Sequence, residues 1–229
     1  MIEDPPLLTV RRPARRPTPA QIALFAGAPT GNVVDCMRGR GALDRSIKAV
    51  TANPPSLCGP AITSFSYPAD NLGASAAVHF AESGDILVCA NDGCTTTALV
   101  GDLMCGMMKN RGVVALVTDG LVRDVEGIEG FKLPVFSAGV TPNSPARTGP
   151  GEVGLPVNLG GQRVDTGDLI VADRDGVVVV PFDMIDAVGQ RLQRVQKLEA
   201  AAEQSIHNGL SEPGDIEALL ASDQTRFID

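Results

Sequence analysis

Apolar residues occur along the chain in short runs, and the runs separate expected strands from expected helices. Continuous apolar runs that are bounded by Gly, Pro or Asp predict buried strands at 57–65, 86–90 and 113–118. Runs that follow acidic or amide residues at helix-like spacing predict helices at 72–81 and 102–111. Strands that alternate with helices are typical of an α/β sheet covered by helices, so we predict the α/β class.

The flanking segments add further elements. Thr18, as N-cap, and Pro19, as first helical residue, predict a short helix through about Ala26. A second helix is expected from about Thr30, and a further strand at 42–50.

The region 131–181 is rich in Gly and Pro and predicts strands and turns without a helix, the strands being at 135–138, 155–159, 169–172 and 177–180. Helices in one half and strands in the other favour a β/β/α layered domain.

The last long helix is predicted from an apolar stripe at helical spacing, formed by Ile185, Val188, Leu192, Val195 and Leu198. We expect Asp183 to cap its start and Gly209 to close it. The predicted organisation is therefore an extended, basic and Pro-rich arm at 1–17, a single domain at 18–208, and a short helix and tail at 209–229.

Composition narrows the possible functions. A net charge of −8 argues against nucleic-acid binding, which needs a basic surface, although the arm itself is basic. Five Cys without a CxxC pair indicate reduced thiols in a cytoplasmic protein. With two His in the chain, a His-rich zinc site is excluded, and a metal would be a hard cation held by oxygen. We expect no membrane span and no secretory signal.

Candidate chemistry gathers in two places. Gly101 and Asp102 open a predicted helix, whose first backbone amides and positive dipole end favour an anion. The buried run 113–118 ends in an Asp-Gly turn, and Arg123 and Asp124 follow directly. Charged residues at the carboxyl end of a buried strand are the usual position of a site in an α/β fold.

The spacing of these residues resembles a known signature. Twenty residues separate Asp102 from Arg123-Asp124, and this D-x20-R-D pattern is similar to that of the class II pyruvate aldolases acting on 4-hydroxy-4-methyl-2-oxoglutarate or 4-carboxy-4-hydroxy-2-oxoadipate. Their superfamily includes the regulators of ribonuclease E activity A. The resemblance covers about residues 20–208 and includes, in order, Asn110-Arg111-Gly112, Pro134-Val135-Phe136, Gly139-Val140-Thr141-Pro142, Val157-Asn158, Gly160-Gly161, Gly167-Asp168 and the turn from Ala172 to Val177.

The resemblance implies a swivelling β/β/α fold, a trimer or hexamer, and roles for particular residues. Asp124 matches the family's ligand for Mg²⁺ or Mn²⁺, and Arg123 matches the residue that holds pyruvate and stabilises its enolate. Asp102 matches an acid that orients water at the metal, and Glu199 an acid supplied by a neighbouring subunit. The segment that receives the substrate carboxylate corresponds to Gly101, Asp102, Leu103 and Met104. The implied reaction splits a small 2-keto acid to pyruvate and a second keto acid, with oxaloacetate decarboxylation alongside.

Each of these three charged residues also has a purely structural explanation. Asp124 could cap the next helix, Arg123 could pair with Glu126 or Asp102, and Asp102 could serve the helix dipole alone. Two other functions also stay open. One is a regulatory binding protein that resembles the inhibitors of ribonuclease E, and the other is a lyase of the same fold for a different keto acid.

Overall fold

The computed structural model describes residues 6–228, so residues 1–5 of the expected arm lie outside the described part. The chain divides into two compact units, one ending at Leu192 and the other beginning at Gln193. This division falls inside a long helix, whereas the sequence led us to expect one domain through residue 208.

A nine-stranded sheet forms the centre of the first unit. Its order is β1-β10-β3-β4-β6-β8-β2, and β13 pairs with both β3 and β14. Strands β3, β4, β6 and β8 run parallel, which places their carboxyl ends at one edge. The strands are β1 (Leu8–Val10), β2 (Lys48–Ala49), β3 (Leu57–Ser66), β4 (Ile86–Ala90), β6 (Ala115–Thr118), β8 (Val135–Ser137), β10 (Gly151–Val153), β13 (Leu169–Ala172) and β14 (Val177–Val180).

Two small sheets complete the strands. One is parallel, in the order β5-β7-β9, and its strands are Ala98–Val100, Leu121–Val122 and Gly139–Val140. The other pairs β11 (Val157–Leu159) with β12 (Gln162–Val164) in antiparallel fashion. The sequence analysis missed β5, β7 and β9, because strands of two or three residues leave no periodic pattern.

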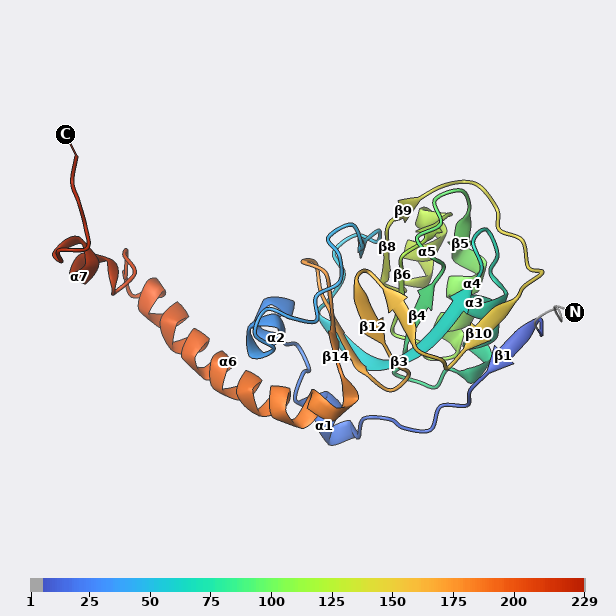
Figure 1. Ribbon diagram of the computed structural model, residues 1–229, viewed down its shortest axis with the longest axis horizontal. Helices are drawn as coiled ribbons and strands as arrows, with labels where there is room; N and C mark the ends of the chain where they lie inside the picture. Colours follow the sequence, from blue (N-terminus) through green and yellow to red (C-terminus); the bar gives the residue numbers. More distant parts are fainter. Residues whose placement is uncertain (1–5, 229) are drawn as a thin grey trace, which may run out of the picture. The chain divides into compact units, whose positions relative to one another are not determined.

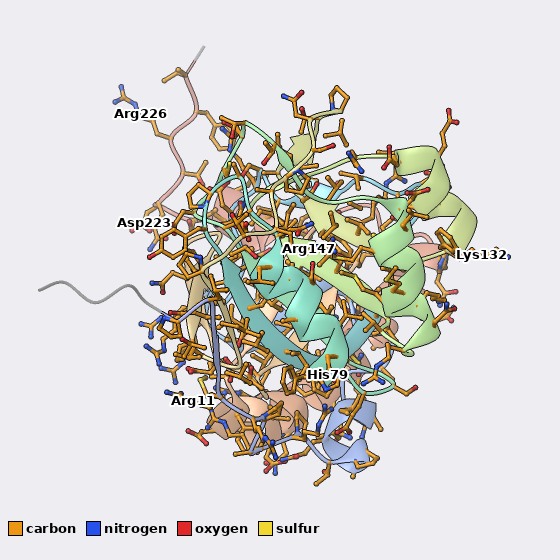
Figure 2. The ribbon with its side chains drawn as sticks, turned by 90° about the vertical axis from the view of Figure 1, so that its right-hand side faces the viewer. Arg11, His79, Lys132, Arg147, Asp223 and Arg226 are labelled. Carbon is orange, nitrogen blue, oxygen red and sulfur yellow. The ribbon has the colours of Figure 1, made fainter. Side chains whose placement is uncertain are left out.

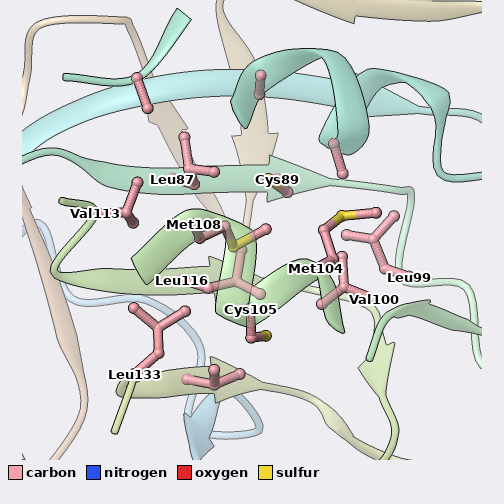
Figure 3. Close-up of a cluster of buried hydrophobic side chains, with 14 of the residues drawn as sticks. Leu87, Cys89, Leu99, Val100, Met104, Cys105, Met108, Val113, Leu116 and Leu133 are labelled. Atoms are coloured by element: carbon pink, nitrogen blue, oxygen red, sulfur yellow. The ribbon is translucent and has the colours of Figure 1, made fainter. Parts of the chain in front are cut away.

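Three helices cover one face of the main sheet (Figure 1). They are α3 (Leu72–Phe80), α4 (Asp102–Asn110) and α5 (Val125–Phe131). Met104, Cys105 and Met108 of α4 are buried in a cluster with Leu87 and Leu116 of the strands beneath (Figure 3). A second cluster on the opposite face packs β11, β13 and β14 against β4 and β6. The predicted α/β layered architecture is therefore confirmed.

The segment that precedes β3 differs from the prediction. Helices α1 (Pro19–Ala23) and α2 (Thr30–Cys36) form as expected, and Thr18 and Gln21 make a reciprocal capping box. The expected strand at 42–50 is reduced to β2, because Asp44 Oδ1 accepts a hydrogen bond from Ser46 N at 2.8 Å and turns the backbone there.

The basic N-terminal segment is packed against the sheet, whereas we expected an extended arm outside the domain at 18–208. Strand β1 pairs in parallel with β10. Arg16 Nη2 then donates to Oδ2 of Asp85, at 2.8 Å, and Asp85 is fully buried. Because an unpaired buried carboxylate is costly, this ion pair fixes the segment on the fold.

The C-terminal region begins with a 3₁₀ turn (Phe182–Met184) that leads into α6 (Ile185–His207) and is followed by α7 (Ile216–Leu220). The prediction that Asp183 caps the long helix is wrong, because it lies within the 3₁₀ turn and no cap hydrogen bond forms. The backbone N–H of Phe182 donates instead to Asp168 Oδ1, at 2.9 Å. In residues 6–228 no helix is both long and apolar enough to cross a membrane.

Candidate active site

The site residues follow two adjacent strands of the small parallel sheet. Gly101 comes directly after β5, and Arg123 comes directly after β7. The N–H of Arg123 donates to the carbonyl oxygen of Val100 at 3.1 Å, which holds the two strand ends side by side. The carboxyl ends of parallel strands meet at one edge, and this is where the charged residues gather.

Gly101 is the point on which two of these side chains converge. A β-carbon at this position would lie 2.6 Å from Asp124 Oδ2 and 3.0 Å from Arg123 Nε. The carboxylate and the guanidinium therefore stand directly over the Gly101 backbone, at the start of α4. Any side chain at residue 101 would displace one of them.

Asp124 occupies a strained position between β7 and α5. Its backbone is left-handed, with φ 59° and ψ 47°, which costs a non-glycine residue on the order of 1 kcal/mol. It stands at the N-cap of α5, yet its side chain makes no capping hydrogen bond. The carboxylate pairs instead with Arg123 Nε at 3.1 Å and is half exposed. The structural interpretation of Asp124 as a helix cap therefore has no support.

Arg123 is held from two sides. Its Nε pairs with Asp124, and its Nη1 donates to the hydroxyl oxygen of Ser144, in the loop that follows β9. Neither Glu126 nor Asp102, the alternative partners considered from sequence, forms an ion pair with it. About one third of the Arg123 side chain is exposed, so its guanidinium is positioned but still accessible to a ligand.

Asp102 is the first residue of α4 and faces α5. Its Oδ1 accepts from the N–H of Leu103 at 2.7 Å, so it does serve the helix start. Its Oδ2 would lie 2.5 Å from a β-carbon on Gly127, in the first turns of α5. The absence of a side chain at Gly127 is therefore what leaves room for the Asp102 carboxylate.

Replacing Gly127 by Ala should displace Asp102, because the added β-carbon would lie 2.5 Å from Asp102 Oδ2 and 2.6 Å from its β-carbon. We expect Gly127→Ala to lower turnover by about tenfold to 100-fold, since small displacements of site groups have effects of that size. The matched control is Gly130→Ala in the same helix, where an added β-carbon meets nothing within 4 Å. Both changes favour helix formation by about 0.5–1 kcal/mol, so equal activity of the two variants would contradict a role for Asp102. Initial rates and melting temperatures of both proteins provide the comparison.

The first turn of α4 also offers backbone donors. The first backbone N–H groups of a helix have no hydrogen-bond acceptor within the helix. In α4 the helical hydrogen bonds begin at Cys105, whose N–H donates to the Gly101 carbonyl oxygen at 3.2 Å. Leu103 is exposed and Met104 is nearly buried, so the helix start is open to solvent on one side. Burial raises the pKa of the Cys105 thiol to about 12, which excludes this neighbour as a nucleophile at neutral pH.

The oxygen donors suit a hard divalent cation. Asp124 and Asp102 bring two carboxylates to the same edge, and Mg²⁺ is typically held by one or two carboxylates together with waters. No group of three or more His, Cys, Asp or Glu able to hold a metal occurs in the described part of the chain. A dedicated protein cage, as for structural zinc, is therefore absent from residues 6–228, and the fit is to a water-rich site.

Glu199 belongs to a different part of the chain. It lies on α6 beyond Leu192, in the second compact unit, and it is exposed. Its assignment to the site stays a prediction.

A cavity of about 580 Å³ shares the helix start with the site. Leu103 and Met104 line one part of it, and Arg147 lines another. The sequence analysis missed both Ser144 and Arg147. Their only signal was a polar loop after the Gly139–Pro142 motif, and the path of that loop depends on strand pairing elsewhere.

Comparison with known proteins identifies the family of the chain. A family model described as RraA-like, Aldolase/RraA, matches residues 30–179. A protein of Halalkalibacterium halodurans named "Putative 4-hydroxy-4-methyl-2-oxoglutarate aldolase" is 33% identical over 189 residues, which are 82% of this chain and 90% of that protein.

Solved structures share the fold. An uncharacterized protein from Pseudomonas syringae matches with a TM-score of 0.77 at 24% identity, over 86% of this chain and 92% of its own. The RNA-processing inhibitor RraA from Thermus thermophilis matches with a TM-score of 0.61 at 26% identity, over 67% of this chain and 93% of its own. A Streptomyces coelicolor member of the RNase ES inhibitor family has a TM-score of 0.75 at 24% identity and covers 83% of this chain and 100% of its own.

Proposed function

Because the chain belongs to the RraA-like family, which joins aldolases with RNA-processing inhibitors, we propose that it is a divalent-metal-dependent aldolase. Its substrate is 4-hydroxy-4-methyl-2-oxoglutarate or 4-carboxy-4-hydroxy-2-oxoadipate, and its products are pyruvate and a second keto acid. Oxaloacetate decarboxylation accompanies this reaction, because both reactions pass through the pyruvate enolate.

One observation carries the proposal. The Arg123 guanidinium and the Asp124 carboxylate converge on the side-chain-free Gly101, at the N-terminus of α4. A cation, a metal-ligating carboxylate and helix amides therefore surround one small volume. These are the groups that a 2-keto acid needs when negative charge develops on its keto oxygen.

The bond that breaks joins C3 and C4 of the substrate. Mg²⁺ or Mn²⁺, held by Asp124 with Asp102 nearby, would supply Lewis-acid stabilisation of negative charge on the substrate oxygens. Amides of the segment 101–104 other than that of Leu103, which already donates to Asp102 Oδ1, bind the C1 carboxylate. The planar Arg123 guanidinium donates to the keto oxygen as it becomes an enolate oxygen, and the hydrogen bond to Ser144 orients the guanidinium for this.

Proton transfer is the second requirement. The C4 hydroxyl must lose its proton as the C3–C4 bond breaks, and we assign to Asp102 the role of orienting the water that receives it. The same water then returns a proton to C3 of the enolate, which becomes the methyl group of pyruvate. In a homo-oligomer, a trimer or hexamer, Glu199 from a neighbouring subunit would add a second acid at this position. The partner molecule is a small 2-keto acid.

Metal removal tests the proposal directly. We expect pyruvate release, coupled to lactate dehydrogenase, from 4-hydroxy-4-methyl-2-oxoglutarate and from oxaloacetate when Mg²⁺ is present. Treatment with EDTA should reduce both rates to background, and added Mn²⁺ should restore them. Pyruvate release that is insensitive to EDTA would contradict the metal assignment, and oxaloacetate turnover alone would place the true aldol substrate elsewhere.

A regulatory function is the second candidate, since one structural neighbour is described as an RNA-processing inhibitor and another as an unusual member of the RNase ES inhibitor family. The presence of both Asp102 and Asp124 favours the enzyme, because a binding protein has no need of two carboxylates beside an arginine. Capture of a ribonuclease scaffold in a pull-down, together with no pyruvate release, would reverse this preference.

A further inference from the structure

We propose that Arg147 binds the distal carboxylate of the substrate, and that the cavity between α3 and α4 is the subsite for the part of the substrate beyond C3. This inference rests on the proposed function and names the residue that recognises the second carboxylate, which both proposed substrates carry beyond the cleaved bond.

The cavity adjoins the reacting centre through the start of α4. Leu103 and Met104, from the segment assigned to the C1 carboxylate, form one part of its wall. Val78 and Met107 extend the wall between the helices. A substrate anchored at the helix start therefore has a space of about 580 Å³ beside it, which is ample for a five- or six-carbon acid.

Arg147 is connected to the site through its own loop. Ser144, three residues earlier, accepts the hydrogen bond from Arg123 Nη1. The loop is anchored at its other side to the start of α3, where Asn71 N donates to the Ala146 carbonyl at 3.0 Å. One short segment thus positions both arginines, and Figure 2 shows Arg147 near the beginning of α3 with His79 near the end.

The guanidinium of Arg147 is fixed but only partly used. Its Nε donates to Oδ1 of the buried Asn71 at 3.0 Å. Within residues 6–228, its two terminal nitrogens have no hydrogen-bond or acidic partner. A guanidinium that is oriented through Nε and keeps both terminal amino groups available has the fork that binds a carboxylate in bidentate fashion.

The other arginine of the cavity is already engaged. Arg111 Nη2 donates to the carbonyl oxygens of His79 and Ala81, at 2.6 and 3.1 Å, and so joins the ends of α3 and α4. Arg111 therefore serves the helix pair, and Arg147 is the cation available to a ligand at the end of the cavity nearer to Leu103.

The lining also fits the rest of such a substrate. Val78, Leu103, Met104 and Met107 present apolar surface, which suits the C4 methyl group of 4-hydroxy-4-methyl-2-oxoglutarate. A flexible methionine wall accommodates substituents of different size at C4. Charge recognition by Arg147, rather than shape, then becomes the main source of discrimination.

Three substrates distinguish recognition of the distal carboxylate from an effect of Arg147 on every reaction of the site. The first is 4-hydroxy-4-methyl-2-oxoglutarate, the second is 4-hydroxy-4-methyl-2-oxopentanoate, which lacks the distal carboxylate, and the third is oxaloacetate, which has nothing beyond the departing carboxylate. For Arg147→Ala we expect kcat/KM to fall about 100-fold with the first and less than about threefold with the others. Arg147→Lys should recover part of the loss, since it keeps the charge without the fork.

Two controls protect the interpretation. Arg45→Ala removes an exposed arginine elsewhere and should change none of the three rates. The melting temperature of Arg147→Ala should match that of the wild type, and oxalate, a mimic of the pyruvate enolate, should inhibit both proteins equally.

The outcomes are distinguishable. Equal losses with all three substrates, or no loss with the first, would overturn the role of Arg147 while the aldolase assignment stands. Absence of pyruvate from the wild-type protein with every substrate would overturn the proposed function and this inference together.

Discussion

Asp124→Asn is expected to abolish metal-dependent pyruvate release, with a loss on the order of 1000-fold or more. The substitution preserves size, and Asn tolerates the left-handed backbone that residue 124 adopts. It removes the negative charge that would hold the cation, and the Lewis-acid contribution of a metal amounts to several kcal/mol, at about 1.4 kcal/mol for each factor of ten. Steady-state rates over a range of Mn²⁺ concentrations should show weaker metal activation as well as slower turnover.

Asp92→Asn is the matched control, because Asp92 is also an exposed aspartate with positive φ, here 54°. It should retain full activity and full activation by Mn²⁺. Unchanged stability of Asp124→Asn, read from the denaturation midpoint, would show that the loss comes from the site. Full turnover by Asp124→Asn would remove the metal assignment to Asp124 and leave Asp102 as the remaining carboxylate of the proposed pair.

Arg123→Lys is expected to lower kcat about 100-fold for both aldol cleavage and oxaloacetate decarboxylation. Lys keeps a positive charge but cannot contact Asp124, Ser144 and an enolate oxygen together, because it lacks the planar fork. Loss of one preorganised donor to a developing oxyanion typically costs a factor of 100 to 1000. A parallel fall in kcat for both reactions distinguishes this role from that of Arg147, whose loss should affect only the substrate with a distal carboxylate.

The control for Arg123→Lys is Arg163→Lys. Arg163 also pairs through Nε with a nearby aspartate, Asp165, at 3.0 Å, but it lies on β12 and is largely exposed. It should show wild-type kinetics. If Arg123→Lys instead raised KM with kcat unchanged, Arg123 would bind substrate and transition state equally and would not stabilise the enolate.

Part of the local structure around this site could be predicted from sequence. The apolar run before Asp119-Gly120 ends a strand as expected, but Arg123 and Asp124 follow β7 of the small parallel sheet, which the sequence analysis did not predict. Gly101 and Asp102 predict the start of a helix, and α4 begins at Asp102 as expected. The sequence did not predict that the Arg123 and Asp124 side chains converge on Gly101, and their roles stay predictions.

Other parts of the site had no local signal. Helix α5 has seven residues, of which two are Gly, so its weak propensity left its bounds undefined in sequence, although a helix after Asp124 was considered. Ser144 and Arg147 lie in an irregular loop whose course is set by β9 and β10, and these short strands pair with distant partners. The capping prediction at Asp183 failed for a related reason, since Asp168, fourteen residues before Phe182, accepts the hydrogen bond from the Phe182 N–H.

The close approach of α3 to β3 has a consequence for engineering. A β-carbon on Gly73 would lie 2.0 Å from the carbonyl oxygen of Phe65, so the helix rests directly on the strand without an intervening side chain. The helix cannot move toward the sheet to enlarge the cavity. To change the substrate range, smaller or larger side chains should therefore be introduced at Val78 and Met107. The close contact of the helix backbone with the strand leaves no room to move or insert backbone there.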